Sequence, residues 1–218
     1  MKFWYDWFSH NIPRWHSYLG HLKDRSNVNA LEIGCFEGRA TVWLLQNILT
    51  HPTSSIIVID TFTGGMENSD HQDNVVNLRK RFEHNIKAWR DKVKILSGLS
   101  HIHLRKMPAI STFDYIYVDG SHMAKDVLED AVLSWRLLKK GGILTFDDYR
   151  DWNFYKDPIL CPRVAIDSFL SIYKNQYEIV DQDYQIALRK VGDTIVVDRS
   201  RPDAEASYLA RIREYLKF

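Results

Sequence analysis

The chain has 218 residues, enough for one globular domain with a sizeable core, with or without small extensions. Its 29 basic and 28 acidic residues give a formal net charge of +1, which excludes a general electrostatic binder of nucleic acid or of anionic membranes. The two cysteines, Cys35 and Cys161, form neither a disulfide framework nor a metal-ligand cluster, so a reducing compartment, the cytoplasm, is expected.

Residues 1–27 form an aromatic extension that we expect to be helical. It begins MKFWYDWFSH, where polar and charged residues interrupt the aromatic ones, so neither a signal peptide nor a membrane span is predicted. We interpret Trp4, Tyr5, Trp7 and Phe8 as the packing face of an N-terminal helix. A cover for a substrate pocket and a dimer contact are the alternatives.

Residues 28–191 alternate between strand-like and helix-like segments. Short β-branched or aromatic runs, bounded by Gly, Asp or Ser, predict strands buried on both faces at 28–34, 54–60, 92–98, 113–120 and 142–148. Apolar spacings of three and four predict helices over 39–50 and 125–140, the second ending at Lys139, Lys140 and Gly141. The alternation predicts an α/β doubly wound, mostly parallel sheet that binds ligands at the carboxyl edge of its strands.

After residue 150 the pattern changes. An aperiodic stretch predicts a long loop, in which four residues are well placed to choose a substrate: Arg150, Trp152, Tyr155 and Lys156. Residues 164–173 predict a helix, and residues 177–191 alternate like two antiparallel strands, although Gly192 and Asp193 could instead turn a hairpin into TIVVD. The charged tail, 192–218, predicts a further helix.

The stretch LEIGCFEGRAT places Gly34 at the end of the first strand and Gly38 at the start of the next helix. Glycine there lets a ligand approach the backbone, but the spacing is not that of a dinucleotide site and no P-loop is present, which disfavours NAD and ATP. Asp60 ends the second strand, where a carboxylate can accept hydrogen bonds from a ribose diol, and Glu32 adds negative charge. These features predict a nucleoside with a cationic or zwitterionic group; tight packing at the glycines and a turn at Asp60 are the alternative.

Four stretches at predicted strand ends carry a family resemblance: LEIGCFEGRAT, VIDTFTGG, FDYIYVDGSH and GGILTFDDY. In this order they resemble class I S-adenosylmethionine-dependent methyltransferases, most closely the branch of macrocin-type and cephalosporin-pathway O-methyltransferases. The resemblance covers about residues 28–191. It implies a Rossmann-like methyltransferase fold and S-adenosylmethionine as the methyl donor.

The resemblance also assigns residues to each part of the donor. Its methionine part would lie against Glu32, Gly34, Cys35, Phe36 and Gly38, with the glutamate near the ammonium group. Its ribose would lie against Asp60 and Thr61, its adenine against Ser97, Gly98, Leu99 and Ser100, and Asp119 would complete the site. The turn departs from the commoner E-x-G-x-G-x-G pattern by placing Phe36 and Glu37 between its glycines.

Asp119 ends the fourth predicted strand, and Asp147 and Asp148 end the fifth. Neighbouring strands lie about 4.8 Å apart, so these carboxylates would converge and repel one another unless a cation lay between them. Oxygen ligands suit Mg²⁺, or alternatively Mn²⁺ or Ca²⁺, and such an ion would hold two substrate oxygens and acidify a hydroxyl group. The resemblance implies the same metal site; the alternative is that Asp147 and Asp148 cap a turn and that Asp119 only orients a stretch of backbone, as in metal-free relatives.

His122, in the D-G-S-H stretch, is a candidate for the base that takes the proton of an acceptor hydroxyl, with Asp119 as its competitor. We therefore predict O-methylation of a small molecule such as a polyol, sugar or catechol-like acceptor. The alternatives are a metal-free N- or O-methyltransferase, an NAD-dependent dehydrogenase and a non-catalytic nucleoside-binding protein. No nucleic-acid or membrane partner is expected, and a homodimer is left open.

Overall fold

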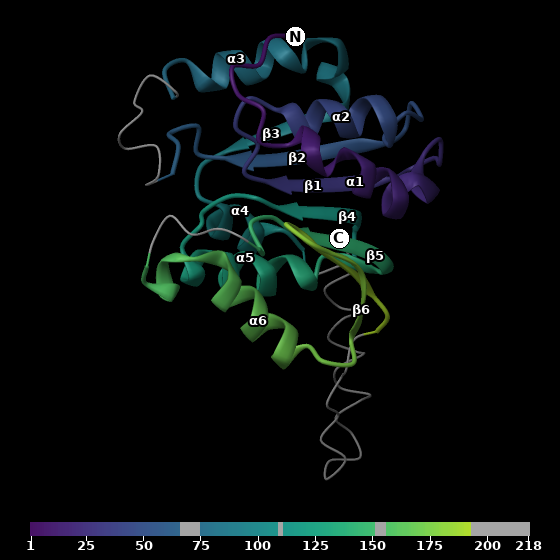
Figure 1. Cartoon of the computed structure of the whole chain (residues 1–218). Coiled ribbons are helices and arrows are strands. Elements are labelled where there is room, and N and C mark those ends of the chain that lie inside the picture. Colours follow the sequence, from purple (N-terminus) through teal and green to yellow (C-terminus); the bar gives the residue numbers. More distant parts are fainter. Residues whose placement is uncertain (66–74, 109–110, 151–155, 193–218) are drawn as a thin grey trace.

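The structure is a computed structural model that describes residues 1–65, 75–108, 111–150 and 156–192. Its centre is a seven-stranded sheet in the order β3-β2-β1-β4-β5-β7-β6 (Figure 1). The strands are β1 (Asn29–Ile33), β2 (Ser55–Asp60), β3 (Val93–Ser97), β4 (Phe113–Val118), β5 (Leu138–Phe146), β6 (Tyr177–Gln182) and β7 (Ile186–Lys190). β1 to β5 pair in parallel and β7 is antiparallel to both of its neighbours, which confirms the predicted α/β fold.

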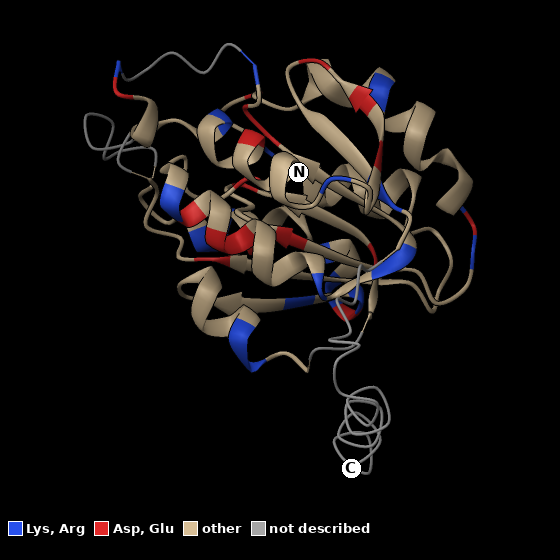
Figure 2. Cartoon of the chain, turned by 90° about the horizontal axis from the view of Figure 1, so that it is seen from below, with Lys and Arg blue, Asp and Glu red and all other residues tan. Residues whose placement is uncertain are grey.

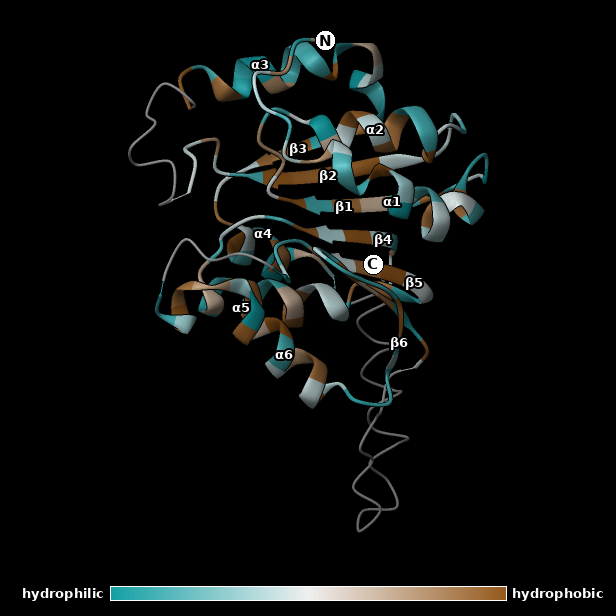
Figure 3. Ribbon diagram, in the orientation of Figure 1, coloured by the Kyte–Doolittle hydropathy of each residue, from teal (hydrophilic) through white to brown (hydrophobic). Residues whose placement is uncertain are grey.

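Helices cover both faces of the sheet (Figure 1). On one face lie α1 (Ile12–Leu19), α2 (Arg39–Asn47) and α3 (Leu78–Asn85), and on the other α4 (Ser100–Lys106), α5 (Ala124–Trp135) and α6 (Pro162–Ile172). Short 3₁₀ turns occupy Ser9–Asn11, Gly20–Leu22, Lys87–Lys92 and Pro158–Leu160. The central strands are therefore buried on both sides, which explains their nearly continuous apolar sequences (Figure 3).

The joint between α5 and β5 differs from the prediction. The helix ends at Trp135, and Lys139 to Gly141 belong to β5 rather than to the helix end. The register between β4 and β5 shifts here, and Gly141 has a φ of +82°, as a bulge requires. The cation at the end of α5 is supplied from β7: the buried Lys190 ammonium donates to the carbonyl oxygens of Trp135 and Leu138.

The C-terminal part of the described chain agrees with the expected hairpin. β6 and β7 pair as antiparallel strands, and α6 covers the helix predicted over residues 164–173. The alternative hairpin into TIVVD and the predicted tail helix lie outside the described residues, as do Trp152 and Tyr155. The expected domain boundaries stay predictions.

The aromatic residues before β1 divide into two groups. Phe8 and Trp15 are buried and their rings meet edge to face at 4.7 Å, so Phe8 packs into the core as predicted. Trp4 and Trp7 are instead 52% and 54% exposed, and for them the predicted packing is wrong. The predicted helix over residues 4–8 is also wrong, because all four aromatic residues there precede the first 3₁₀ turn at Ser9 and α1 begins only at Ile12. We refer to residues 2–10 as the N-terminal segment.

Acidic and basic residues are interspersed over the helices and loops seen in Figure 2, as the near-zero net charge leads one to expect. Among the described residues, no helix has the length and apolar character needed to cross a bilayer.

Candidate active site

The ends of five parallel strands meet at one edge of the sheet. The amide of Gly34 donates to Ile59 at 2.8 Å, and that of Gly98 donates to the carbonyl oxygen of Asp60 at 2.9 Å. On the other side of β1, the amide of Asp119 donates to Ile33 at 2.8 Å. The residues assigned to the donor and to the metal thus converge at the carboxyl edge, as the alternating sequence predicted.

Both glycines of the first turn lie in the left-handed region, with φ of +80° at Gly34 and +82° at Gly38. A Cβ on Gly34 would overlap the carbonyl oxygen of Asp119 and lie 2.6 Å from the Cα of Gly120. A Cβ on Gly38 would lie 2.8 Å from the Phe82 ring. Tight packing therefore requires both glycines, whatever ligand approaches the turn.

Asp60 ties the first turn to the end of β2. One carboxylate oxygen accepts from the amides of Cys35 and Phe36, at 2.7 and 3.0 Å, and the other accepts from Phe62 at 2.6 Å. The carboxylate thus fixes the backbone that would face the donor. Its predicted contact with the ribose remains a prediction, as does that of Thr61, which is exposed beside it.

Glu32 lies beneath this turn and is 1% exposed. Its carboxylate accepts from the Thr41 hydroxyl at 2.5 Å. Burial raises the pKa of Glu32 to about 8, and the nearby negative charge of Asp60 adds to the shift, while the Thr41 hydrogen bond opposes it. A cationic group bound at the turn would favour the ionised carboxylate, which is consistent with the predicted role near the donor's ammonium group.

The segment assigned to the adenine follows β3. Ser97 accepts from Arg79 at 3.0 Å, and Gly98 has a φ of +130°. Leu99 is 52% exposed, and Ser100 begins α4. An exposed apolar side chain at the carboxyl edge suits the face of a base, so the geometry supports this assignment, which stays a prediction.

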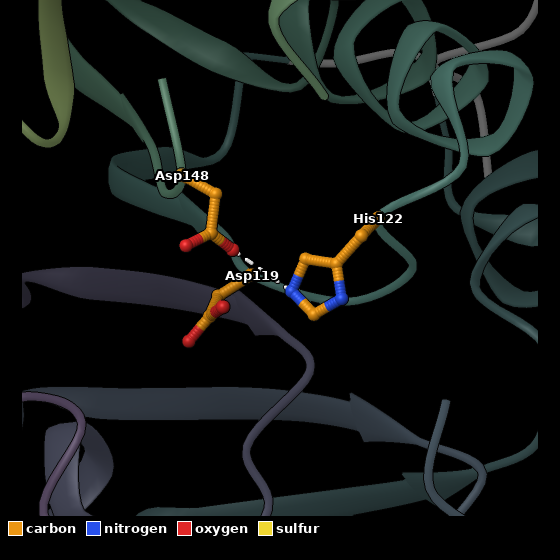
Figure 4. Close-up of side chains that lie close together, drawn as sticks. All are labelled: Asp119, His122 and Asp148. Atoms are coloured by element: carbon orange, nitrogen blue, oxygen red, sulfur yellow. Dashed lines mark ion pairs between the residues drawn. The ribbon is translucent and has the colours of Figure 1, made fainter. Parts of the chain in front are cut away.

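Beyond β4 and β5, three ligand-capable side chains come together (Figure 4). They are Asp119, His122 and Asp148, whose nearest ligand atoms all lie within 4.8 Å of one another. Nε2 of His122 is 2.8 Å from a carboxylate oxygen of Asp148. Two carboxylate oxygens and one imidazole nitrogen are a donor set that could hold a divalent cation.

This group differs in one member from the three aspartates that the sequence predicted. Asp147 does not belong to this group: its carboxylate accepts from the Tyr117 hydroxyl at 2.6 Å and from the Gln185 side chain at 3.0 Å, although its charge still acts strongly on the neighbouring Asp119. Consecutive side chains at a strand end point in different directions, and Asp148 moreover has a φ of +54°. His122, expected as a base, occupies the third position instead.

The carboxylates in this region repel one another when they are ionised. Burial, and then the negative charges of Asp147 and Asp148, raise the pKa of Asp119 well above its usual value. Burial and the neighbouring Asp148 raise the pKa of Asp147 to about 6. A bound cation would reverse this destabilisation of the ionised forms.

Sequence reasoning missed the residues that hold these carboxylates. Tyr184 donates its hydroxyl hydrogen to Asp148, and Trp15 donates to Gln185 at 2.6 Å, which in turn holds Asp147. No local motif marks these partners. The only signal was the turn between the two alternating strands after residue 177, which places Tyr184 and Gln185 beside β5.

Comparison with known proteins agrees with this geometry. Residues 31–149 match a protein family described as a methyltransferase domain. Protein R132 of Acanthamoeba polyphaga mimivirus is 25% identical over 148 residues, which make up 67% of this chain and 62% of that protein. The chain thus spans somewhat less than two thirds of the length of this relative.

Two solved structures share the fold. The O-methyltransferase TomG of Streptomyces achromogenes, solved with S-adenosylmethionine, has a TM-score of 0.58 and 16% identity, covering 83% of this chain and 80% of TomG. An O-methyltransferase of Bacillus cereus, solved with S-adenosylhomocysteine, has a TM-score of 0.53 and 17% identity, covering 74% of each chain. The family match includes the glycine turn, Asp60, the Asp119–His122 stretch and the aspartate pair. The family match covers more than half of the chain, so the chain belongs to this methyltransferase-domain family.

Proposed function

We propose that the protein transfers the methyl group to a hydroxyl oxygen of a small molecule with the help of a divalent metal ion. The observation that carries the proposal is the convergence of Asp119, His122 and Asp148 at the edge where the donor is expected to bind. The two neighbours described as O-methyltransferases support oxygen as the acceptor atom. The motifs that resemble the macrocin-type and cephalosporin-pathway branch support the same choice.

In the reaction, the acceptor oxygen forms a bond to the methyl carbon while the bond from that carbon to the sulfonium sulfur breaks. The hydroxyl proton passes to solvent water, the electron pair of the broken bond stays on sulfur, and S-adenosylhomocysteine is the second product. The sulfonium is already activated, so the chain must align the two substrates and favour loss of the proton. When bound, a divalent cation would supply Lewis-acid chemistry that lowers the pKa of the acceptor hydroxyl.

The chain's own residues perform the alignment. The glycine turn, held by Asp60, sets the position of the donor. Asp119 and Asp148 supply the carboxylates of the metal site, and His122 supplies the nitrogen. Tyr184 orients Asp148 through its hydroxyl group. An acceptor with two adjacent oxygens fits such a site best, because both oxygens can reach one cation.

A metal-free reaction is the second candidate, and one observation favours it. The 2.8 Å contact between His122 and Asp148 is also the geometry of an imidazole base steadied by a carboxylate. In that case His122 would take the hydroxyl proton directly, and the acceptor atom could be nitrogen or oxygen.

Release of S-adenosylhomocysteine with a panel of vicinal diols, with EDTA and after adding back Mn²⁺ or Mg²⁺, tests the proposal. Binding of Mn²⁺ by wild type, Asp148→Asn and the exposed control Asp91→Asn gives a readout that does not depend on turnover. We expect EDTA to abolish turnover and Asp148→Asn to lose Mn²⁺ binding, while Asp91→Asn behaves as wild type. Full turnover in EDTA would contradict the proposed role of a metal ion and would favour the mechanism in which His122 acts as the base.

A further inference from the structure

The N-terminal segment contacts both ends of the site. The ring of Trp7 lies 5.0 Å from that of Phe36, in the glycine turn. Three residues later, the ring of His10 lies 5.1 Å from that of Tyr184, whose hydroxyl group donates to Asp148. Three residues span at most about 10 Å, a distance comparable with one aromatic ring and its substituents. The segment therefore lies beside the region between the donor turn and the proposed metal site.

Several interactions fix the segment in this position. The Glu37 carboxylate, from the same turn, accepts from the amide of Trp4 at 2.8 Å and pairs with Arg81 at 2.8 Å. The Arg81 guanidinium also lies over the Trp4 ring, 4.3 Å from its centroid. Arg39 donates to the carbonyl oxygen of Tyr5 at 3.1 Å. Because Glu37 is 2% exposed, these anchors are part of the folded domain rather than casual surface contacts.

Trp7 is exposed in a way that packing does not explain. Tyr5 stacks on it with centroids 5.0 Å apart, and Phe36 contacts it as well, yet 54% of Trp7 remains exposed. Its neighbour Phe8 is only 6% exposed. A large aromatic side chain held in place beside a binding site, with half of its surface in water, is typical of a surface that a ligand covers.

We propose that Trp7, backed by Tyr5 and Phe36, forms the acceptor-side wall of the active site and selects an acceptor whose adjacent hydroxyl groups are carried by a planar aromatic ring. This inference rests on the proposed function, since Asp119 and Asp148 would hold the two oxygens through the metal. The ring of such an acceptor would bury the exposed surface of Trp7 by stacking. A saturated diol of the same spacing would gain less from this wall, because it has no planar π-system.

The test compares 3,4-dihydroxybenzoate with cis-cyclohexane-1,2-diol. Trp7→Ala should raise both the KM and the Kd for the aromatic diol by about tenfold. The Kd is measured by calorimetry in the presence of S-adenosylhomocysteine and Mn²⁺. For the saturated diol, both values should change by less than about twofold. Trp7→Phe keeps an aromatic ring and should lose no more than about threefold. The control is Ile172→Ala, because Ile172 is a large apolar residue, 70% exposed, at the end of α6 and outside the N-terminal segment; it should leave both acceptors unchanged.

Three results would overturn the inference: equal weakening of both acceptors by Trp7→Ala, no weakening of either, or conversion of a dimer into monomers as the only effect, which would make Trp7 a contact between copies. Unchanged affinity for S-adenosylhomocysteine in Trp7→Ala shows that the glycine turn is intact.

The metal proposal and the Trp7 proposal can fail independently of each other. If EDTA leaves turnover intact and Trp7→Ala still weakens only the aromatic diol, the proposed metal mechanism is refuted and the proposed role of Trp7 is retained. If wild type binds only the saturated diol and EDTA abolishes turnover, the proposed role of Trp7 is refuted and the proposed metal mechanism is retained.

Discussion

Replacing Gly34 by alanine should both destabilise the fold and displace Asp119 of the proposed metal site. A Cβ at this position would overlap the carbonyl oxygen of Asp119 and lie 2.6 Å from the Cα of Gly120. Both are backbone atoms, so no change of rotamer relieves the overlap. The ends of β1 and β4 would have to separate by roughly 1 Å to restore ordinary contact distances.

The loss of free energy of unfolding in Gly34→Ala has two parts, and a comparison with Gly141→Ala separates them. The left-handed backbone at Gly34 costs alanine about 1–2 kcal/mol, and forced overpacking adds about 1–3 kcal/mol. The sum is a large share of a total stability of roughly 5–15 kcal/mol. Gly141 has nearly the same φ, +82°, but a Cβ there would meet nothing within 4 Å. Gly141→Ala should therefore cost only the first part.

Urea unfolding of wild type, Gly34→Ala and Gly141→Ala at one pH measures both parts as differences in the free energy of unfolding. Turnover should fall roughly 100-fold in Gly34→Ala, because Asp119 moves with its own carbonyl group, and stay near wild type in Gly141→Ala. Equal stability of the two variants would refute the claim that close contact between the strand ends, and not only the backbone conformation, demands glycine at Gly34.

Three further predictions concern buried charged groups. The pKa of Glu32 is raised from 4.5 in the unfolded chain to about 8, so its stabilising contribution is complete below pH 4.5 and is lost as the pH rises to about 8. Between about pH 5 and about pH 9, the free energy of unfolding should therefore fall less in Glu32→Gln than in wild type. Parallel pH curves for the two proteins would contradict this. Lys190→Met should lower the free energy of unfolding by about 2–4 kcal/mol, since two buried carbonyl oxygens lose their donor, and an unchanged urea midpoint would show that they find another. Glu37→Gln should cost about 2–4 kcal/mol by leaving Arg81 without its buried partner, and should speed chymotrypsin cleavage within the N-terminal segment; an unaltered cleavage rate would mean that other contacts anchor it.

The fold could be predicted because its rules are local. Strands buried on both faces read as short apolar runs, and the helices between them repeat apolar residues every three or four positions. The α5–β5 joint could not be predicted in this way. Lys139 and Lys140 resemble the basic end of a helix, but the cation that caps α5 is Lys190, which is distant in sequence and arrives there only through the pairing of β7 with β5.

The site could be predicted to the level of the strand end and no further. Parallel pairing alone brings Gly34, Asp60 and Asp119 to one edge, so their convergence follows from the alternating pattern. The direction of each side chain does not follow from it. Asp147 and Asp148 are equivalent in the sequence, and only partners outside their own motif distinguish them.

Those partners explain why Asp148, and not Asp147, faces His122. Trp15 of α1 donates to Gln185 from 170 positions away, and Gln185 then donates to Asp147. Asp148 has a different set of partners and contacts Tyr184 and His122. Chain segments from the beginning and the end of the described domain thus hold the two aspartates in different positions. A substitution at Trp15 should accordingly disturb the proposed metal site through Gln185 and Asp147, although none of the hydrogen bonds or ring contacts described for Trp15 involves a candidate ligand.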